Sequence, residues 1–258
     1  MSHRTLIDGT GYDITGGRTL IGGTGYDIKG GRTLVDGVGY DLNFSKSFAD
    51  YTWSEIIAAC ASKTVPDTWA IGDQKPMTIG GTNYLIDIIG KNHDTYSSGG
   101  TAPITFQLHD SYTSMYAMHN TDVNSVGWVD CYMRTNRLQT ILNQMPSEVK
   151  AAIKAVNKKT TAGNKSTSIV TTSDKLFLLA EMEVFGTDTY SSSQEGTQYE
   201  YYSLGNSRVK RVNGSASTWG LRSPWKKSTS VYVQVSASGS VDTLSANRTR
   251  GVSFAFCF

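Results

Sequence analysis

The chain has 258 residues, which is enough for one large domain and a smaller attached segment. Its formal net charge is only +2, which excludes the strong field that attracts nucleic acid or membrane surfaces. No apolar run reaches about 18 residues and no signal-peptide core is present, so we expect synthesis in the cytoplasm and no membrane insertion. Cys60, Cys131 and Cys257 are far apart in apolar contexts, which indicates buried thiols rather than disulfides or a zinc site.

The first 42 residues contain three copies of a 14-residue repeat, which begin at Arg4, Arg18 and Arg32. Each copy has a β-prone Arg-Thr-Leu-Ile or Arg-Thr-Leu-Val run, an Asp-Gly or Gly-Gly pair, and a second run that ends Tyr-Asp-Ile or Tyr-Asp-Leu. A glycine-containing pair between β-prone runs is typical of tight turns, so the pattern predicts one β-hairpin per copy. Such a short period is typical of units that stack in assemblies.

One repeat copy buries too little apolar area to offset the entropy of ordering a glycine-rich segment. We therefore predict that residues 1–43 form an arm that needs a partner, anchors the protein and makes it a homo-oligomer. A flexible linker is the alternative, but linkers are usually aperiodic and rich in Gly and Ser. The predicted anchoring residues are the aliphatic and tyrosine positions of the copies: Leu6, Ile7, Tyr12, Leu20, Ile21, Tyr26, Leu34, Val35 and Tyr40.

The repeats stop near residues 43–50, and a second domain is predicted over residues 51–258. Its first element is a helix over residues 53–63, because Thr52 and Glu55 have the spacing of a capping box before an apolar run. Further strands are predicted at residues 75–79, 83–90 and 104–108, the first two as a hairpin around a Gly-Gly turn.

A second helical block is predicted over residues 134–157, with a break at Pro146. Its lysines are expected on a solvated helix face, and a nucleic-acid patch is the alternative. Residues 175–185 are then predicted as a central strand and residues 186–214 as a long polar loop. The other predicted strands are residues 168–172, 219–222 and 231–235, with a buried strand at 251–258.

This order of elements predicts an α+β domain that is compatible with a C-type-lectin-like fold. Several phrases of the domain, taken together and in order, resemble a family of unknown function that is common in phages and prophages of gut bacteria. They include Tyr51–Ile56, Trp69–Asp73, Ile89–Asp94, Asp174–Glu181 and Trp219–Pro224. The last of these, with Gly251–Phe256, is also similar to C-type-lectin-like and formylglycine-generating-enzyme-like domains. The repeat is similar to arms of phage structural proteins, so the resemblance implies a virion protein with a lectin-like head.

No residue pattern indicates a catalytic or metal site. The four histidines do not form a His-Glu-x-x-His motif, and His93 and His109 are expected to make local hydrogen bonds. The series Asn120, Asp122 and Asn124 has the spacing of a calcium loop but lacks its glycine and its glutamate. The sugar-binding triplets of calcium-dependent lectins and the reactive cysteines of formylglycine-generating enzymes are not matched either. No cofactor is therefore expected.

Two segments, residues 190–202 and 225–250, are rich in Tyr, Ser, Asn, Thr and Gly, which is typical of binding loops. The predicted ligand contacts are Trp225, Tyr232, Gln234, Asn247, Arg248 and Arg250. For Tyr232 and Gln234 the alternative is simple alternation on a strand with one wet face. Arg222 is expected to be structural, with its guanidinium packed between aromatic rings and backbone carbonyls.

We therefore expect a non-enzymatic phage virion protein, assembled in the bacterial cytoplasm. Its arm would bind other virion proteins, and its second domain would bind a host-surface glycan or protein rather than nucleic acid. One alternative is a decoration protein of the particle without a ligand. The other is a hydrolase of cell-wall glycan, in which Glu181 and Glu183 share one face of a strand. Capsid and tail locations are both open.

Overall fold

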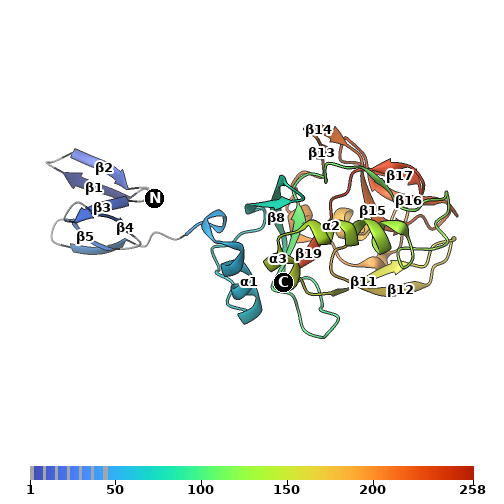
Figure 1. Cartoon of the computed structure of the whole chain (residues 1–258), viewed down its shortest axis with the longest axis horizontal. Coiled ribbons are helices and arrows are strands. Elements are labelled where there is room, and N and C mark those ends of the chain that lie inside the picture. The colour runs from blue at the N-terminus through green and yellow to red at the C-terminus, as the bar shows by residue number, and fades with distance from the viewer. Residues whose placement is uncertain are drawn as a thin grey trace. The chain divides into compact units, whose positions relative to one another are not determined.

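The structure is a computed structural model that divides the chain into two compact units, residues 1–47 and residues 48–258. It describes the backbone of six strands between residues 3 and 42, and the backbone and side chains of residues 46–258 (Figure 1). Helix makes up 21% and strand 32% of the chain, so the fold is mixed helix and sheet, and its sheets are small and antiparallel.

The first unit contains one antiparallel hairpin per repeat copy, as predicted. The hairpins are β1 (His3–Ile7) with β2 (Thr10–Ile14), β3 (Gly17–Ile21) with β4 (Thr24–Ile28), and β5 (Gly31–Val35) with β6 (Val38–Leu42). The register is the same in all three, and it places the repeat arginine opposite the repeat aspartate. The connecting turns and the side chains of the predicted anchoring residues, Leu6 to Tyr40, lie outside the described residues.

The second unit begins with a short 3-10 helix, η1 (Phe48–Asp50), and with helix α1 (Trp53–Ser62). The predicted capping box is present: the Glu55 N–H donates to the Thr52 hydroxyl, and the Thr52 N–H donates to the Glu55 carboxylate at 2.7 Å. The helix ends at Lys63, which has a left-handed backbone with φ of 56°. The prediction of a helix over residues 53–63 is therefore confirmed.

A four-stranded antiparallel sheet forms the centre of this unit, in the order β19-β9-β8-β7. Its strands are β7 (Gln74–Ile79), β8 (Thr82–Lys91), β9 (Ile104–Leu108) and β19 (Ala255–Cys257). The predicted β7–β8 hairpin and the strand at 104–108 are confirmed. The predicted C-terminal strand is buried but shorter, and its Phe256 ring stacks on Phe106 of β9 with centroids 5.4 Å apart.

The second helical block is correct only in its first part. It consists of a π-helical turn, η2 (Met133–Arg137), and of helices α2 (Leu138–Gln144) and α3 (Ser147–Ala152), with the predicted break at Pro146. Beyond Ala152 the prediction is wrong, because the chain forms β11 (Val156–Thr161), which pairs with β12 (Ile169–Asp174). Strand alternation buries Lys158 and exposes Lys159, so the two do not share a solvated helix face.

The predicted central strand over residues 175–185 is also wrong. Only Phe177 bridges to a strand, at Ala255, and the chain then turns into helix α4 (Glu181–Phe185). The Glu183 carboxylate accepts a hydrogen bond from the Ala180 N–H at 2.9 Å, which fixes the first helical turn. Gly186, with φ of 69°, ends the helix in the left-handed conformation that glycine favours.

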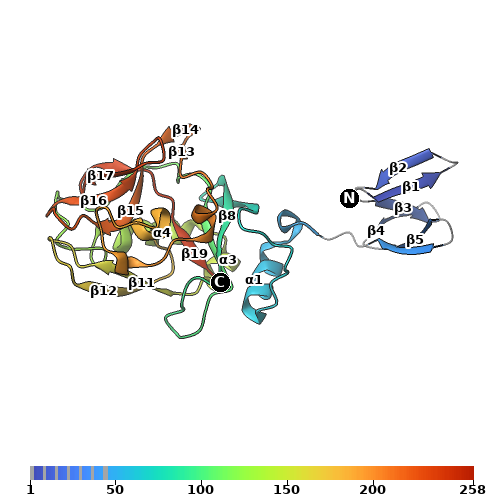
Figure 2. The same ribbon diagram turned by 180° about the vertical axis from the view of Figure 1, so that it is seen from behind.

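The rest of the unit consists of short elements. A three-stranded sheet contains β15 (Trp219–Pro224), β16 (Val231–Val235) and β17 (Val241–Ser245). The smaller pairs are β13 (Lys210–Val212) with β14 (Ser215–Ser217) and β10 (Tyr116–Ala117) with β18 (Thr249–Arg250), and the short helices are η3 (Ser193–Glu195) and α5 (Glu200–Ser203). The prediction of a loop over residues 186–214 is therefore wrong in part, because this segment contains η3, α5 and β13. Figures 1 and 2 show β16, β17 and β12 at one end of the unit and α1 at the other.

Within the described part of the chain, the helices are too short or too polar to cross a membrane.

Candidate functional site

Four buried charges, Asp94, Lys158, Glu183 and Arg222, form what we call the charge network. The Lys158 ammonium lies 2.7 Å from both the Asp94 and the Glu183 carboxylates. Arg222 binds the same Glu183 carboxylate through two nitrogens, at 2.5 and 2.9 Å. All four residues are at most 4% exposed. Two acids and two bases therefore cancel one another inside the unit, which is the condition for burying charge without a large penalty.

Arg222 connects the network to the backbone. Its guanidinium also donates to the carbonyls of Leu178 and Glu195, at 2.9 and 2.8 Å, and to the Thr160 hydroxyl at 3.1 Å. These contacts join β15 to β11, to the segment before α4 and to η3, and they include the backbone carbonyls expected around a structural Arg222. A lysine has three donors on one atom and would not reproduce this planar fork.

The network shifts the pKa values of its acids. Burial alone would raise the pKa of Asp94, but Lys158 and a hydrogen bond from Thr105 hold it at about 2. Burial likewise opposes ionisation of Glu183, and the charges of Arg222 and Lys158 overcome it and lower the pKa of Glu183. Glu195 lies beside the network without a direct ion pair, and burial raises its pKa.

A depression with a volume of about 430 Å³ lies over the network, with the buried Asp94, Lys158 and Glu183 in its floor. Its rim carries His93, Asn157, Lys159 and Thr197. The His93 ring stacks on Tyr199 with centroids 3.9 Å apart, and its partial burial lowers its pKa. Because the floor charges are already paired with one another, they stabilise the fold and leave little binding capacity for a ligand.

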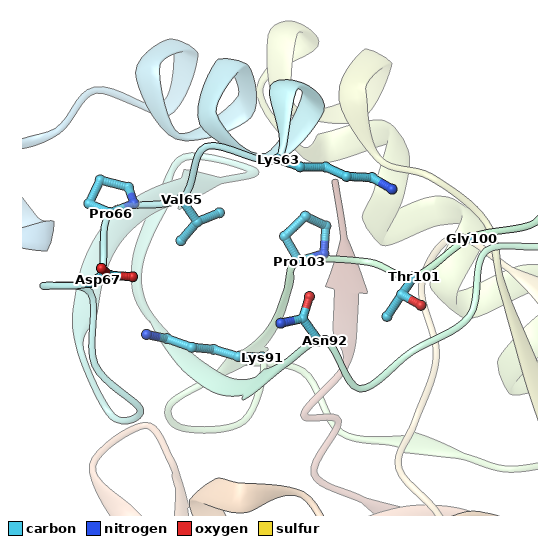
Figure 3. Close-up of a pocket in the computed structure, with 9 residues that line it drawn as sticks. All are labelled: Lys63, Val65, Pro66, Asp67, Lys91, Asn92, Gly100, Thr101 and Pro103. Carbon is cyan, nitrogen blue, oxygen red and sulfur yellow. The ribbon is translucent and has the colours of Figure 1, made fainter.

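A second depression, which we call the lysine recess, has a volume of about 410 Å³ and a different character (Figure 3). Lys63 enters it from the end of α1, Lys91 and Asn92 from the end of β8, and Asp67 and Thr101 from the neighbouring loops. In residues 46–258, none of these five side chains makes a hydrogen bond or an ion pair with another described residue. The recess therefore offers two ammonium groups, a carboxylate, an amide and a hydroxyl to solvent.

Three of the six predicted contact residues are buried. The Tyr232 hydroxyl donates to the Gly127 carbonyl at 2.8 Å, and the Gln234 amide donates to the Asp242 carboxylate at 2.8 Å. The Arg250 guanidinium binds the carbonyl of Ser245 at 2.5 Å. At most 2% of each residue is exposed: Tyr232 and Gln234 lie on β16, which is buried on both faces, and Arg250 lies on β18. A surface ligand cannot reach them in this structure.

The other three predicted contacts are accessible and lie at one end of the three-stranded sheet. Trp225 is half-buried and its N–H binds the Val231 carbonyl, while Val231 pairs with Ser245 on β17. The exposed Asn247 and Arg248 lie in the turn after Ser245, where the Arg248 N–H binds the Ser245 carbonyl. The fold thus brings these two residues to the same sheet end as Trp225.

In the series Asn120, Asp122 and Asn124, which has the spacing of a calcium loop, Asn124 makes hydrogen bonds within the fold. The buried Asn124 amide donates to the carbonyls of Ser228 and Val231, and its oxygen accepts the Asn164 N–H at 2.9 Å. Among the described residues, no group of His, Cys, Asp and Glu side chains is arranged to hold a metal ion. A local hydrogen bond is expected for His109, but its Nδ1 lies 2.9 Å from the carboxylate of Asp87, which is 22 residues away in sequence and belongs to the neighbouring strand β8. All three cysteines are free and buried.

The sequence did not predict the charge network or the lysine recess. Alternation along Val156–Thr161 was the available signal for the inward side chain of Lys158, but the lysines favoured a helix. Lys63 and Lys91 are 28 residues apart in sequence, and they line the same recess only because the fold places the end of α1 near the end of β8. No local pattern joins them.

Residues 105–258 match the family described as Domain of unknown function (DUF6273). The matched segment runs from β9 to the C-terminal residue, and it contains Lys158, Glu183 and Arg222 but not the residues of the lysine recess. No curated protein and no solved structure matches the chain. Because the match covers more than half of the 258 residues, the chain belongs to the DUF6273 family of domains of unknown function.

Proposed function

We propose that this chain is a phage virion protein whose repeat unit attaches it to other virion proteins and whose second unit, a C-type-lectin-like domain, binds the host surface. The observation that carries the proposal is the arm: three consecutive hairpins with one register, in a unit separate from the body. Repeated small units of this kind gain stability from neighbours rather than from a core of their own.

The strand pairing supports a role of the arm in assembly. Each hairpin is a two-stranded sheet, so both of its strands are edge strands among the described residues. Edge strands present unpaired N–H and carbonyl groups, which pair readily with another chain. Three such hairpins give a partner, or further copies of this chain, repeated and equivalent points of attachment.

The surface of the second unit supports a role in binding. The accessible Trp225 lies at the same sheet end as Asn247 and Arg248, and such aromatic and polar mixtures are typical of binding surfaces. The lysine recess is a second surface with unpaired polar groups. A ligand-free decoration protein is the second candidate, and it would need neither surface.

The hydrolase alternative assumed that Glu181 and Glu183 share one face of a strand. Glu181 and Glu183 lie on α4, where residues two apart do not face the same side. The Glu181 carboxylate accepts the N–H groups of Tyr190 and Ser191, and Glu183 is paired with Arg222 and Lys158. Both carboxylates are therefore held by partners inside the unit.

The binding half of the proposal is tested with the purified full-length chain and with cells of the host bacterium. We expect the chain to bind the cells and to reduce subsequent phage adsorption in a dose-dependent manner, whereas heat-denatured chain does neither. Absence of both effects at micromolar concentration would contradict host-surface binding and favour the decoration protein.

A further inference from the structure

We propose that the lysine recess binds an anionic saccharide, a sugar that carries a carboxylate or a phosphate group. The inference rests on the proposed host-surface function and names the ligand class and the site. The recess lies between the end of α1 and the end of β8, outside the segment that matches the family.

Charge is the first reason. Two ammonium groups, those of Lys63 and Lys91, line the recess together with one carboxylate, that of Asp67. In Figure 3 the Lys91 side chain extends toward the side where Asp67 lies, and Lys63 extends toward the side of Thr101. Neither lysine has an ion-pair partner within residues 46–258. An ammonium that is not neutralised internally can form a charge-assisted hydrogen bond with a carboxylate or phosphate oxygen.

The other groups suit the hydroxyl-bearing frame of a sugar. The Asn92 amide and the Thr101 hydroxyl both donate and accept hydrogen bonds, and the Asp67 carboxylate accepts them from hydroxyl groups. Val65, Pro66 and Pro103 provide apolar wall that suits the C–H faces of a ring. The volume of about 410 Å³ lies within the range of about 300–1,000 Å³ that small-molecule sites occupy.

The backbone holds the two chain segments in place before a ligand arrives. Lys63 and Asn92 both have positive φ, 56° and 51°, which side-chain-bearing residues adopt at an energetic cost. The Lys63 N–H binds the Cys60 carbonyl at 3.2 Å, and the Asn92 N–H binds the Pro103 carbonyl at 3.0 Å. Glycine is the residue that adopts such a backbone without strain.

The depression over the charge network is the weaker candidate for the same ligand. Its buried cation, Lys158, is neutralised by Asp94 and Glu183, each at 2.7 Å. Recruiting Lys158 for a ligand would break a buried ion pair, which is strongly destabilising. The lysines of the recess are available without such a loss.

The test uses calorimetric titration of the full-length chain with three saccharides of equal length: one with glucuronate units, one with phosphate groups, and a neutral glucose oligomer. We expect binding of at least one acidic saccharide and at least tenfold weaker binding of the neutral one. The double variant Lys63→Gln/Lys91→Gln should weaken acidic binding at least tenfold. The control Lys175→Gln/Lys227→Gln removes the same charge from two other exposed lysines, and it should bind like wild type.

The two acidic saccharides distinguish a carboxylate ligand from a phosphate ligand, and either result supports the inference. Equal binding of the neutral saccharide, no binding of either acidic one, or unchanged affinity of the recess variant would overturn it. Host-cell adsorption is measured in parallel to separate the two proposals. If wild type adsorbs but titration shows no acidic-saccharide binding that depends on the recess, the recess inference fails while the attachment function stands. If wild type binds acidic saccharide through the recess but does not adsorb, the attachment function fails.

Discussion

At the scale of single residues, two lysines show how context decides the role of one side chain. Lys158 is buried beside two carboxylates, and its charge stabilises the fold. Lys63 ends a helix at a position where glycine is favoured, and its ammonium faces solvent in a recess. Both carry the same chemical group, and only the second is available to a ligand.

The backbone strain at Lys63 leads to a prediction in which stability and binding change in opposite directions. Lys63→Gly removes a left-handed side-chain-bearing residue at the end of α1, so the free energy of unfolding should rise by up to about 1 kcal/mol. The same change removes an ammonium from the lysine recess and should weaken binding of acidic saccharide. Urea unfolding and titration measure the two effects. A variant that is both less stable and unchanged in binding would contradict the role given to Lys63.

The pKa of Asp94 leads to a prediction about pH. Its folded value of about 2 lies below the ordinary value of 3.8, so its carboxylate stabilises the fold above pH 3.8, and this contribution is lost as the pH falls toward 2. Asp94→Asn should lower the free energy of unfolding by roughly 2 kcal/mol at pH 7. The difference from wild type should shrink between pH 4 and pH 2 in urea unfolding.

The matched control for this experiment is Asp122→Asn, which changes an exposed carboxylate in a loop of the same unit. It should leave the free energy of unfolding nearly unchanged throughout the pH range. An Asp94→Asn effect that is absent at pH 7, or that persists undiminished at pH 2, would show that the charge of Asp94 does not stabilise the fold.

At the scale of elements, the predicted and observed structures agree where the signal is local. The capping box at Thr52, the Gly-Gly turn between β7 and β8, and the break at Pro146 each depend on a few neighbouring residues. These signals act through backbone conformation and need no distant partner. The three hairpins of the arm follow from the same kind of signal.

The disagreements occur where a distant partner decides. The lysine-rich segment 156–161 is a strand paired with β12, and its alternation turns Lys158 inward to Asp94, which is 64 residues away in sequence. The apolar run before α4 ends in a helix because Glu183 binds both the Ala180 N–H and Arg222 of β15. β16 buries Tyr232 and Gln234 on one face and Val233 on the other, so alternation could not identify a solvent-facing side. The charge network and the lysine recess could not be predicted either, because each brings together residues that are distant in sequence.

The packing of the loop between β11 and β12 is tested at Gly163, with Gly214 in the turn between β13 and β14 as the control. Gly163 and Gly214 have nearly the same backbone, with φ of 82° and 83°. A Cβ at Gly163 would lie 1.9 Å from the Asn124 carbonyl oxygen, whereas a Cβ at Gly214 would have no atom within 4 Å. Gly214→Ala should therefore cost about 1 kcal/mol of backbone strain, and Gly163→Ala at least about 3 kcal/mol, in urea unfolding. Equal losses would show that the two loops do not pack as described.

At the scale of the whole molecule, the chain combines a repeated unit and a body with different sources of stability. The body has a large buried core that includes the aromatic residues around Phe106 and the charge network. The arm consists of three two-stranded sheets, and isolated two-stranded hairpins are at best marginally stable in water. This difference is the physical basis for our proposal that the arm acts in assembly and the body binds a ligand.

The most direct test of this account is the composition of purified phage particles from the bacterium that encodes the chain. Particles are separated on a density gradient, and the chain is quantified by mass spectrometry relative to the major capsid protein. We predict that the full-length chain is found with the particles at a fixed ratio, and that deletion of residues 1–43 reduces this ratio at least tenfold while the body remains folded. Absence of the full-length chain from particles, or full occupancy by the deletion variant, would contradict the account.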